Sequence, residues 1–357
     1  MRLARLWLSD FRSYSSAEFE PAPDGLTVIV GSNGQGKTNL LEGIAYLATL
    51  ASFRGAPTEA LLRAGTDRAV VRAEGDRDGR PLLLEAEINR IGRDRVLVNR
   101  QPLKRARDLL GALRVTVFAP DDLVLVKGGP ADRRRYLDEL LVALHPRNDA
   151  LRSDVERIVR QRTSLLKQSG GRLTPDIALT LDVWDAKLAV AGSALVDARR
   201  QLVATLEPVI GKAYDQVASS AAVVRSVYVC SWQGDLGVAL AAARADDIRR
   251  GVTTVGPHRD ELELTLSGLP SRTHASQGEQ RSLALSLRLA AHDVVTETTG
   301  SAPVLLLDDV FSELDPGRSE ALTRHLPAGQ ALLTTAGDLP PGAVPARVVR
   351  IASGRII

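Results

Sequence analysis

The sequence predicts a mixed α/β protein in which both ends of the chain build one domain and a helical segment is inserted between them. Strand-like apolar patterns lie near both ends of the 357 residues, whereas a long heptad pattern occupies the middle. Apolar residues make up 44% of the chain, which is enough to form a sizeable core. We expect a discontinuous α/β domain of residues 1–120 and 230–357, and a helical arm domain of residues 121–229.

The N-terminal third favours strands and one helix. Apolar and polar residues alternate from residue 3, and the apolar run Leu26–Val30 closes this stretch. Helical periodicity follows over residues 37–50. Short alternating segments separated by Asp, Gly and Arg turns then occupy residues 69–98, and they predict an antiparallel sheet.

The middle of the chain predicts an antiparallel helical hairpin. Its second helix carries apolar residues at alternating spacings of four and three, which is a heptad pattern. These residues are Ile177, Leu181, Trp184, Leu188, Ala191, Leu195, Ala198 and Leu202. That helix is expected over residues 177–206, a length of roughly 43 Å at 1.5 Å per residue. Ser169-Gly170-Gly171 and Pro175 separate it from a helical segment before it.

Strand patterns return after Gly256. A strand is expected over Glu261–Leu266 and a helix over residues 279–298, and strands follow over residues 303–307 and 331–335. These elements complete the discontinuous α/β domain.

Composition excludes several classes of protein. No apolar run approaches the roughly 18 residues that a membrane span needs. Charged residues interrupt the apolar stretches of the N-terminus, unlike those of a signal peptide. Cys230 is the single cysteine, so neither an internal disulfide nor a multi-cysteine zinc site is possible. We therefore expect a cytoplasmic protein that does not contact membranes.

A phosphate-binding loop is the most specific motif, since residues 31–38 match G-x-x-x-x-G-K-[ST] at every fixed position. The loop consists of Gly31, Ser32, Asn33, Gly34, Gln35, Gly36, Lys37 and Thr38. It follows an apolar strand and opens a helix, which disfavours a chance glycine-rich turn. Backbone N–H groups would surround phosphates, Lys37 would reach the β- and γ-phosphates, and Thr38 would ligate Mg²⁺. ATP and Mg²⁺ are the expected cofactors, and Lys37 is an expected catalytic residue.

Two carboxylates follow the apolar run of residues 304–307. A phosphate-bound Mg²⁺ needs a carboxylate at such a strand end, and Asp308 would supply it directly or through water. Asp309 would then polarise the attacking water, which makes it the second expected catalytic residue. A solvated Asp-Asp turn is the alternative, but the accompanying phosphate loop favours the metal site.

A third motif precedes the helix expected over residues 279–298. Ser276, Gln277, Gly278 and Glu279 fit an S-x-G-[EQ] signature, in which the serine hydroxyl, the glycine backbone and the helix dipole face a γ-phosphate. Ser276 and Glu279 also fit an S-x-x-E capping box, so the motif can be a helix start, and the two interpretations are compatible. Together, the three motifs predict a P-loop ATPase of the ATP-binding-cassette type. In that class signature serines meet the nucleotide of the opposite subunit, which implies a head-to-tail homodimer.

Six stretches over most of the chain resemble the RecF family, bacterial gap-repair ATPases of the SMC/Rad50 branch. They are DFRSY (10–14), GSNGQGKTNLLE (31–42), FAPDDLVLVKGGPADRRRYLD (118–138), VGPHRDEL (255–262), SQGEQRSLALSLRLA (276–290) and LLLDDVFSELDPGR (305–318). Ser312, Glu313, Leu314 and Asp315 match the family's D-loop, which crosses the dimer interface.

The resemblance implies an ATP-binding-cassette-type head and an ATP-driven homodimer that clamps single-stranded, gapped or junction DNA. It also implies a role with RecO and RecR in loading RecA, and therefore in recombinational repair, DNA replication and SOS induction. Weak, DNA-dependent hydrolysis of ATP to ADP and phosphate would reset the clamp.

Three departures from transporter-type cassettes favour slow hydrolysis. Thr334-Thr335 occupies the place of the switch histidine. No convincing match to the Q-loop glutamine is present. Asp309 stands where Glu is usual, with a side chain one methylene shorter.

Two segments concentrate positive charge, although the whole chain carries only +3. Residues 90–114 have a net charge of +6 and residues 127–172 of +5, an asymmetry typical of polyanion binding. The candidate DNA contacts are Arg100, Lys104, Arg105, Arg133 and Arg134. A solvated arginine-rich face is the alternative, and helix contacts or interface salt bridges explain the last two equally well.

Alternative interpretations remain for one turn and for the whole protein. His258 and Arg259 follow a Gly-Pro turn, where a structural role is favoured over a catalytic one. A non-repair cassette ATPase that acts as a protein-coupled switch would share the motifs, but 238 residues separate Thr38 from Ser276 and the helical insertion fills that gap. A structural SMC-like or Rad50-like protein needs arms of hundreds of residues.

Overall fold

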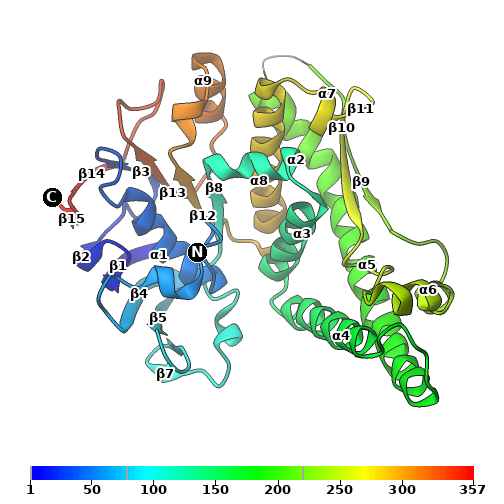
Figure 1. The fold of residues 1–357 in the computed structure, drawn as a ribbon. Coiled ribbons are helices and arrows are strands. Elements are labelled where there is room, and N and C mark those ends of the chain that lie inside the picture. The colour runs from blue at the N-terminus through cyan, green and yellow to red at the C-terminus, as the bar shows by residue number, and fades with distance from the viewer. Residues whose placement is uncertain (1, 78, 219–220) are drawn as a thin grey trace. The chain divides into compact units, whose positions relative to one another are not determined.

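The computed structural model describes residues 2–77, 79–218 and 221–357. The chain divides into two compact units. The head unit comprises Met1–Leu123, Lys212–Ala221 and Arg281–Ile357, and the arm unit comprises Val124–Gly211 and Ala222–Gln280. The head unit is therefore discontinuous in sequence, as the colours of its strands in Figure 1 show.

The first sheet of the head unit is antiparallel and has the strand order β2-β1-β4-β5-β6-β7. Its strands are β1 (Arg2–Phe11), β2 (Tyr14–Phe19), β4 (Arg68–Arg77), β5 (Arg80–Asn89), β6 (Arg95–Val98) and β7 (Gln101–Pro102). Leu6 and Leu8 of β1 are buried, whereas Trp7 between them lies on the other face, beneath the guanidinium groups of Arg5 and Arg72. The antiparallel sheet predicted over residues 69–98 is confirmed.

The second sheet of the head unit has the order β15-β14-β3-β13-β12-β8, and all its pairings except β14–β15 are parallel. Its strands are β3 (Gly25–Val30), β8 (Val115–Phe118), β12 (Val304–Asp308), β13 (Gln330–Thr335), β14 (Arg347–Ala352) and β15 (Arg355–Ile356). Every residue of β12 is buried, as is usual for a parallel strand covered on both faces. The carboxyl ends of β3, β12 and β13 meet at one edge of the sheet.

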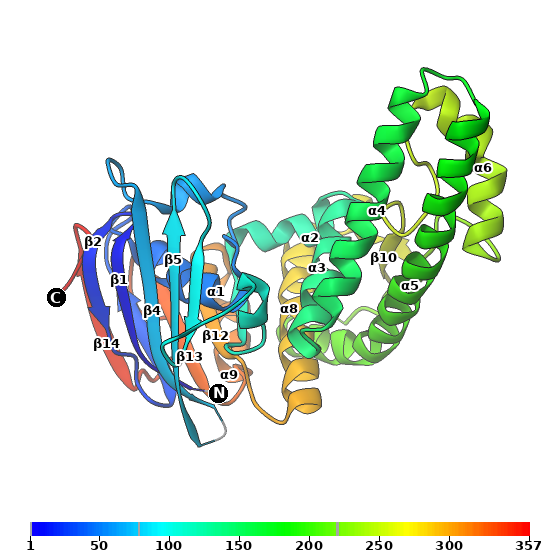
Figure 2. The ribbon, with the colours of Figure 1, turned by 90° about the horizontal axis from the view of Figure 1, so that it is seen from below.

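Layers on both faces of the parallel sheet form the head unit. One core joins α1 (Lys37–Thr49) to the antiparallel sheet and to the face of the parallel sheet that carries Leu306. A second core joins the opposite face, which carries Leu305, to α8 (Gln277–Thr299) and α9 (Pro316–Arg324). Figure 2 shows α1 between the two sheets.

The arm unit contains the predicted helical hairpin. Its helices α4 (Asn148–Gln168) and α5 (Pro175–Val217) are joined by a turn in which Gly170 and Gly171 have positive φ angles. Each heptad residue predicted for α5 is buried or half-buried. The 43-residue helix is longer than predicted because buried residues continue its apolar face beyond Pro208, and its last six residues belong to the head unit.

Arg162, which interrupts the apolar spacing along α4, is fully buried. Its guanidinium donates hydrogen bonds to Asp185 of α5 at 2.6 Å and to Asp247 of α6 (Leu236–Arg250) at 2.5 Å. A buried charge is costly unless it is paired, so this network holds three helices of the arm in one arrangement.

The arm unit also contains a three-stranded sheet, in the order β11-β10-β9. Its strands are β9 (Val224–Val229), β10 (Glu261–Leu266) and β11 (Leu269–Pro270). β9 and β10 pair residue by residue along their whole length. The unit boundaries therefore differ from the predicted division between residues 229 and 230, which would separate two paired strands. Residues 222–280 belong to the arm unit.

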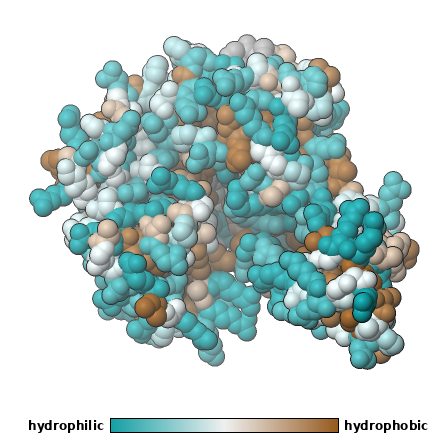
Figure 3. All heavy atoms as spheres, in the orientation of Figure 1, coloured by the Kyte–Doolittle hydropathy of each residue, from teal (hydrophilic) through white to brown (hydrophobic). Residues whose placement is uncertain are grey.

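Helices α2 (Val124–Lys127), α3 (Pro130–Leu144) and α7 (Ser271–His274) also belong to the arm unit. Figure 3 shows hydrophobic atoms at the lower right of the view. Among the large apolar residues of α5, Leu179 and Val183 are exposed. Within the described parts of the chain, no helix is both long and apolar enough to cross a membrane.

Candidate nucleotide-binding site

The phosphate-loop motif connects β3 to α1 at the edge of the parallel sheet. Gly34 and Gly36 have φ angles of 79° and 109°, a region that favours glycine. A Cβ built on Gly34 would have no neighbour within 4 Å, so this side of the loop is open to a ligand. A Cβ on Gly36 would lie 2.9 Å from the Ser13 hydroxyl oxygen, so the loop also packs tightly at its end.

Lys37, the first residue of α1, is buried within the loop. Its Nζ donates to the carbonyl oxygens of Gly31 at 2.6 Å and Ser32 at 3.0 Å. Burial lowers the pKa of Lys37, while the nearby carboxylates of Asp309 and Asp308 oppose that effect. The ammonium group is thus held where a phosphate on the loop would meet it.

A hydrogen-bond network joins the phosphate loop to the end of β12. Thr38 Oγ1 donates to Asp308 Oδ1 at 2.9 Å, and Thr334 Oγ1 donates to the same oxygen at 2.8 Å. Thr334 Oγ1 in turn accepts a hydrogen bond from the backbone N–H of Asp309 at 3.0 Å. The two motifs lie 270 residues apart in sequence but are in direct contact.

The environment of Asp308 suits a divalent cation. Burial raises the pKa of its carboxyl group, although the hydrogen bonds from Thr334 and Thr38 oppose the rise. Because the carboxylate is poorly solvated, a cation beside it would recover much of the lost solvation energy. The oxygens of Thr38 and Asp308 are hard donors of the type that Mg²⁺ prefers, so these residues fit the expected ion.

Two further residues shape this edge of the sheet. Asp309 adopts a left-handed conformation with φ of 49°, which turns the chain immediately after β12. Arg54, in the loop after α1, is a nearby cation that lowers the pKa of Asp308. Arg54 was not predicted, since no motif marks it. Thr334 was noted at the place of the switch histidine, but its bridging role was not predicted.

The signature residues form the capping box that the sequence allowed. Ser276 Oγ accepts a hydrogen bond from the Glu279 backbone N–H at 3.3 Å, and Glu279 Oε2 accepts one from the Ser276 backbone N–H at 2.7 Å. Gln277 and Gly278 lie between them at the start of α8. Ser276 is exposed, and its hydroxyl also donates a hydrogen bond to Glu279 Oε2 at 2.7 Å.

The predicted D-loop residues connect β12 to α9. Ser312 Oγ donates to the carbonyl oxygen of Asp309 at 2.7 Å. Asp315 caps α9, because its carboxylate accepts a hydrogen bond from the Arg318 backbone N–H at 3.0 Å, and this bond lowers its pKa. The Glu313 carbonyl oxygen accepts a hydrogen bond from Arg281 of α8 at 2.6 Å.

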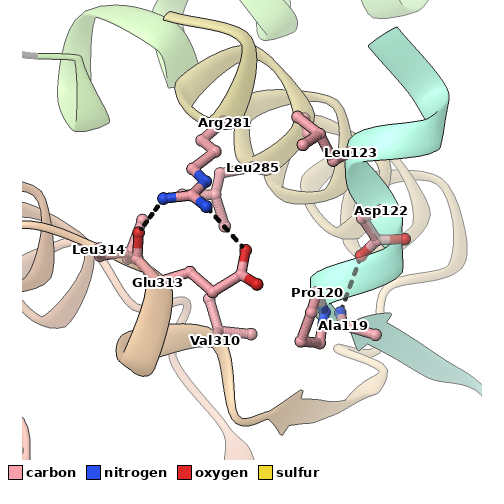
Figure 4. A pocket seen from close by; sticks show the side chains of 10 residues that line it. Ala119, Pro120, Asp122, Leu123, Arg281, Leu285, Val310, Glu313 and Leu314 are labelled. Atoms are coloured by element: carbon pink, nitrogen blue, oxygen red, sulfur yellow. Dashed lines mark hydrogen bonds and ion pairs between the residues drawn. The ribbon is translucent and has the colours of Figure 1, made fainter. Parts of the chain in front are cut away.

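A small hollow lies beside the D-loop in the head unit, and Figure 4 shows Arg281 and Glu313 across it. Leu285, Val310 and Leu314 supply apolar lining. Its volume of about 40 Å³ is room for a few water molecules, so it is too small for a nucleotide.

The candidate DNA contacts fall into two groups. Arg100, Lys104 and Arg105 of the head unit are exposed. Arg133 of the arm is buried, and its guanidinium donates to both Glu261 carboxylate oxygens at 2.7 Å and to two backbone carbonyls. Its three nitrogens are engaged inside the arm, so Arg133 is a structural residue and we do not propose it as a DNA contact.

Neighbouring polar residues of the arm are also engaged. Arg134 is half-buried and donates to the Asp260 carbonyl oxygen at 2.6 Å, which leaves it a weak candidate for DNA. His258 Nε2 and the Arg259 guanidinium both meet the Thr253 carbonyl oxygen, at 3.0 Å and 3.1–3.2 Å. These contacts hold the turn together and agree with a structural role for His258 and Arg259.

The layered head and its joined phosphate-loop and carboxylate motifs define a P-loop head of the ATP-binding-cassette type. The family model described as RecF/RecN/SMC N terminal domain matches residues 2–333. The chain belongs to the RecF family.

Individual relatives agree with this assignment. The DNA replication and repair protein RecF of Streptomyces avermitilis is 44% identical over 374 residues, covering 100% of this chain and 99% of the relative. That of Frankia alni is 45% identical over 379 residues, with the same coverage. A solved structure of "the recombination mediator protein RecF-ATP in RecFOR pathway" is 27% identical, has a TM-score of 0.92, and covers 100% of this chain and 97% of that chain. The Smc head domain from Pyrococcus furiosus shares the fold at a TM-score of 0.57 and 15% identity, covering 100% of this chain and 96% of that chain.

Proposed function

We propose that this chain is an ATP-dependent DNA-binding protein of recombinational repair. The observation that carries the proposal is the contact of Thr38 with Asp308, because it assembles a phosphate loop and a metal carboxylate in the manner of a nucleotide switch. Membership of the RecF family supplies the process, and relatives named for DNA replication and repair support it.

In the proposed site, the backbone N–H groups of residues 31–38 and the Lys37 ammonium bind the phosphates of ATP. Thr38 and Asp308 hold Mg²⁺, which would neutralise charge on the phosphates when bound. Asp309 orients and polarises the attacking water. The Thr334 hydroxyl group binds the Asp308 carboxylate and the backbone N–H of Asp309. Thr334 has no titratable group of its own, which fits slow hydrolysis.

ATP is proposed to close a homodimer. The exposed Ser276 and the N-terminus of α8 would face the γ-phosphate in the opposite subunit, and the D-loop of residues 312–315 would cross the interface. Hydrolysis to ADP and phosphate would remove that anion and reopen the dimer.

DNA is proposed to bind the exposed cations of the head unit. Arg100, Lys104 and Arg105 are exposed and make no ion pair with any residue that the structure describes. Arginine and lysine bind backbone phosphates without reading sequence, so single-stranded, gapped and junction DNA are all suitable ligands. Binding to DNA would in turn stimulate the weak ATPase.

The proposed cellular role follows the family. The closed dimer would act in the cytoplasm with RecO and RecR to help load RecA, which supports DNA replication and SOS induction. The solved relative is described within the RecFOR pathway, and that description supports this choice of partners.

A protein-coupled switch without a DNA ligand is the alternative function. The candidate site would be the same, but the exposed cations at residues 100–105 would then be an ordinary solvated surface. DNA binding that does not depend on ATP would favour this alternative.

The decisive experiment measures DNA binding by fluorescence anisotropy with and without ATP and Mg²⁺, on single-stranded, duplex and gapped substrates. We expect ATP to strengthen binding in the unchanged protein. The variant Lys37→Met should lose ATP binding and the ATP effect while it keeps the thermal stability of the nucleotide-free protein. ATP binding that survives this substitution would refute the site, and DNA affinity that ignores ATP would refute the clamp.

A further inference from the structure

The turn formed by Ser353 and Gly354 contacts the phosphate loop at Gln35. In the tight turn between β14 and β15, the backbone N–H of Ser353 donates to Gln35 Oε1 at 2.5 Å. The N–H of Gly354 donates to the Gln35 carbonyl oxygen at 3.1 Å. Gln35 is thus held through its side chain and its backbone by residues more than 300 positions away in sequence.

The backbone segments around these bonds pack so closely that there is no room for a side chain at Gly31 or Gly354. A Cβ built on Gly31 would lie 2.4 Å from the Ile351 carbonyl oxygen, and one on Gly354 would lie 2.8 Å from the Ser13 carbonyl oxygen. Distances below 3 Å are shorter than real Cβ contacts. Three segments therefore pack tightly against one another: the start of the phosphate loop, the β1–β2 turn and the C-terminal turn.

The sheet fixes where the C-terminal turn lies. Strand β14 pairs in parallel with β3 up to Arg350 opposite Val30, the residue before the phosphate loop. Strand β15 then folds back, with Ala352 opposite Arg355, and the Ile357 N–H donates to the Arg350 carbonyl oxygen at 2.9 Å. The turn is therefore held beside residues 31–35.

We propose that the C-terminal turn, residues 352–355, is a positioning element of the nucleotide site. By holding Gln35, it fixes the curvature of the phosphate loop before ATP arrives, so that less ordering is left to the binding step. Gln35 is a positioning residue here, because its side chain is bound to Ser353. The inference rests on the proposed ATP site. It adds that residues 352–355 increase the affinity of that site for ATP.

A matched pair of glycine substitutions tests the proposal. Gly354→Ala places a methyl group against the Ser13 carbonyl oxygen at a residue whose φ is +67°. Gly342→Ala has the same backbone strain, with φ of +77°, but its methyl group meets only the Thr323 side chain at 3.8 Å. We expect both variants to lose thermal stability, and Gly354→Ala to lose more because its methyl group also meets a backbone oxygen. Only Gly354→Ala should bind a fluorescent ATP analogue with Mg²⁺ less tightly, by roughly three- to tenfold.

A further variant, Gln35→Met, removes the oxygen that accepts the hydrogen bond from Ser353 and adds no backbone strain. We expect the KM for ATP to rise by roughly three- to tenfold while kcat at saturating ATP stays within about twofold, because Asp308 and Asp309 are untouched. A purely structural defect would lower the melting temperature without raising KM while kcat stays nearly constant.

The outcomes separate the two ideas. If Lys37→Met abolishes ATP binding while Gly354→Ala and Gln35→Met bind ATP as the unchanged protein does, the ATP site stands and the positioning role is overturned. Equal losses of ATP affinity in the two glycine variants would also overturn it. If Lys37→Met binds ATP normally, the proposed site itself fails.

Discussion

Replacing Thr334 with valine should weaken both the head unit and its nucleotide chemistry. The residue is buried, and valine keeps its shape while it removes the hydroxyl group. The lost bond to the Asp308 carboxylate contributes about 1.5–3 kcal/mol, and the lost bond from the Asp309 N–H about 0.5–1.5 kcal/mol. The free energy of unfolding should therefore fall by roughly 2–4 kcal/mol. In a unit of about 210 residues, that lowers the melting temperature by roughly 5–15 °C.

The effect of Thr334→Val should depend on pH with a defined sign. The hydrogen bond from Thr334 stabilises the ionised form of Asp308, so its removal raises the pKa of that carboxyl further. Burial already holds this pKa above its usual value, so the protonated form is favoured in the fold and stability is lost as pH rises through the raised pKa. The stability of the variant should therefore differ most from that of the unchanged protein at pH 8. The difference should be smallest in acid, where Asp308 is protonated in both proteins.

Calorimetry of the nucleotide-free protein at several pH values provides the assay. Thr335→Val is the control, because among the described residues its hydroxyl bonds the Asp338 carbonyl oxygen at 3.4 Å and the Gly337 N–H at 3.2 Å and neither catalytic carboxylate. Thr334→Ser, which keeps the hydroxyl, should recover most of the loss. Equal melting temperatures for the two valine variants, or a difference that does not change with pH, would refute the reasoning.

Three other variants and the salt dependence of DNA binding test the proposed cycle. Asp309→Asn should bind ATP, hydrolyse it at least tenfold more slowly and accumulate as a dimer in sedimentation velocity with ATP; a monomer would contradict the proposed role. Ser276→Arg should leave ATP binding to each monomer unchanged but prevent ATP-driven dimerisation, and a dimer would reduce the serine to a helix cap. In the unchanged protein, the logarithm of duplex affinity should fall with the logarithm of salt concentration at a slope near −4 to −5, for about five phosphate contacts. Neutralising Arg100, Lys104 and Arg105 together should flatten that slope with no change in ATP affinity, and an unchanged slope would place the DNA elsewhere.

Periodicity and motif spacing were sufficient to predict much of the fold. The strand Glu261–Leu266 was predicted at its observed bounds, and the heptad pattern placed the buried face of α5 correctly. The length of α5 was underestimated because the heptad pattern was followed only to Leu202, whereas Ile210 and Tyr214 continue the buried face. The arm strand β9 was not predicted, because its pairing with β10 depends on contacts between residues that are distant in sequence.

The candidate site shows the same limit. The glycines and Lys37 of the phosphate loop and the carboxylates of β12 carry patterns, so they were predicted together. Thr334 was recognised only as a replacement for the switch histidine, and the register of β13 beside β12 brings its hydroxyl to Asp308. In the arm, the high arginine content led to a wrong prediction that Arg133 binds DNA. The buried Arg133 forms an ion pair with Glu261 and is unavailable to a polyanion.

The place of β3 in the middle of its sheet makes the site depend on segments that are synthesised much later than the phosphate loop. Val28 pairs with Leu333 on one side and with Val348 on the other, more than 300 residues later in the chain. At roughly 5–20 residues per second, a ribosome needs about 15–60 s to make the partners after it has made β3. During that time the strand has exposed edges and cannot hold the phosphate loop in shape. A chain that is cut short before β13 and β14 should therefore bind ATP poorly, because the strand that leads into the phosphate loop then lacks both of its neighbours in the sheet.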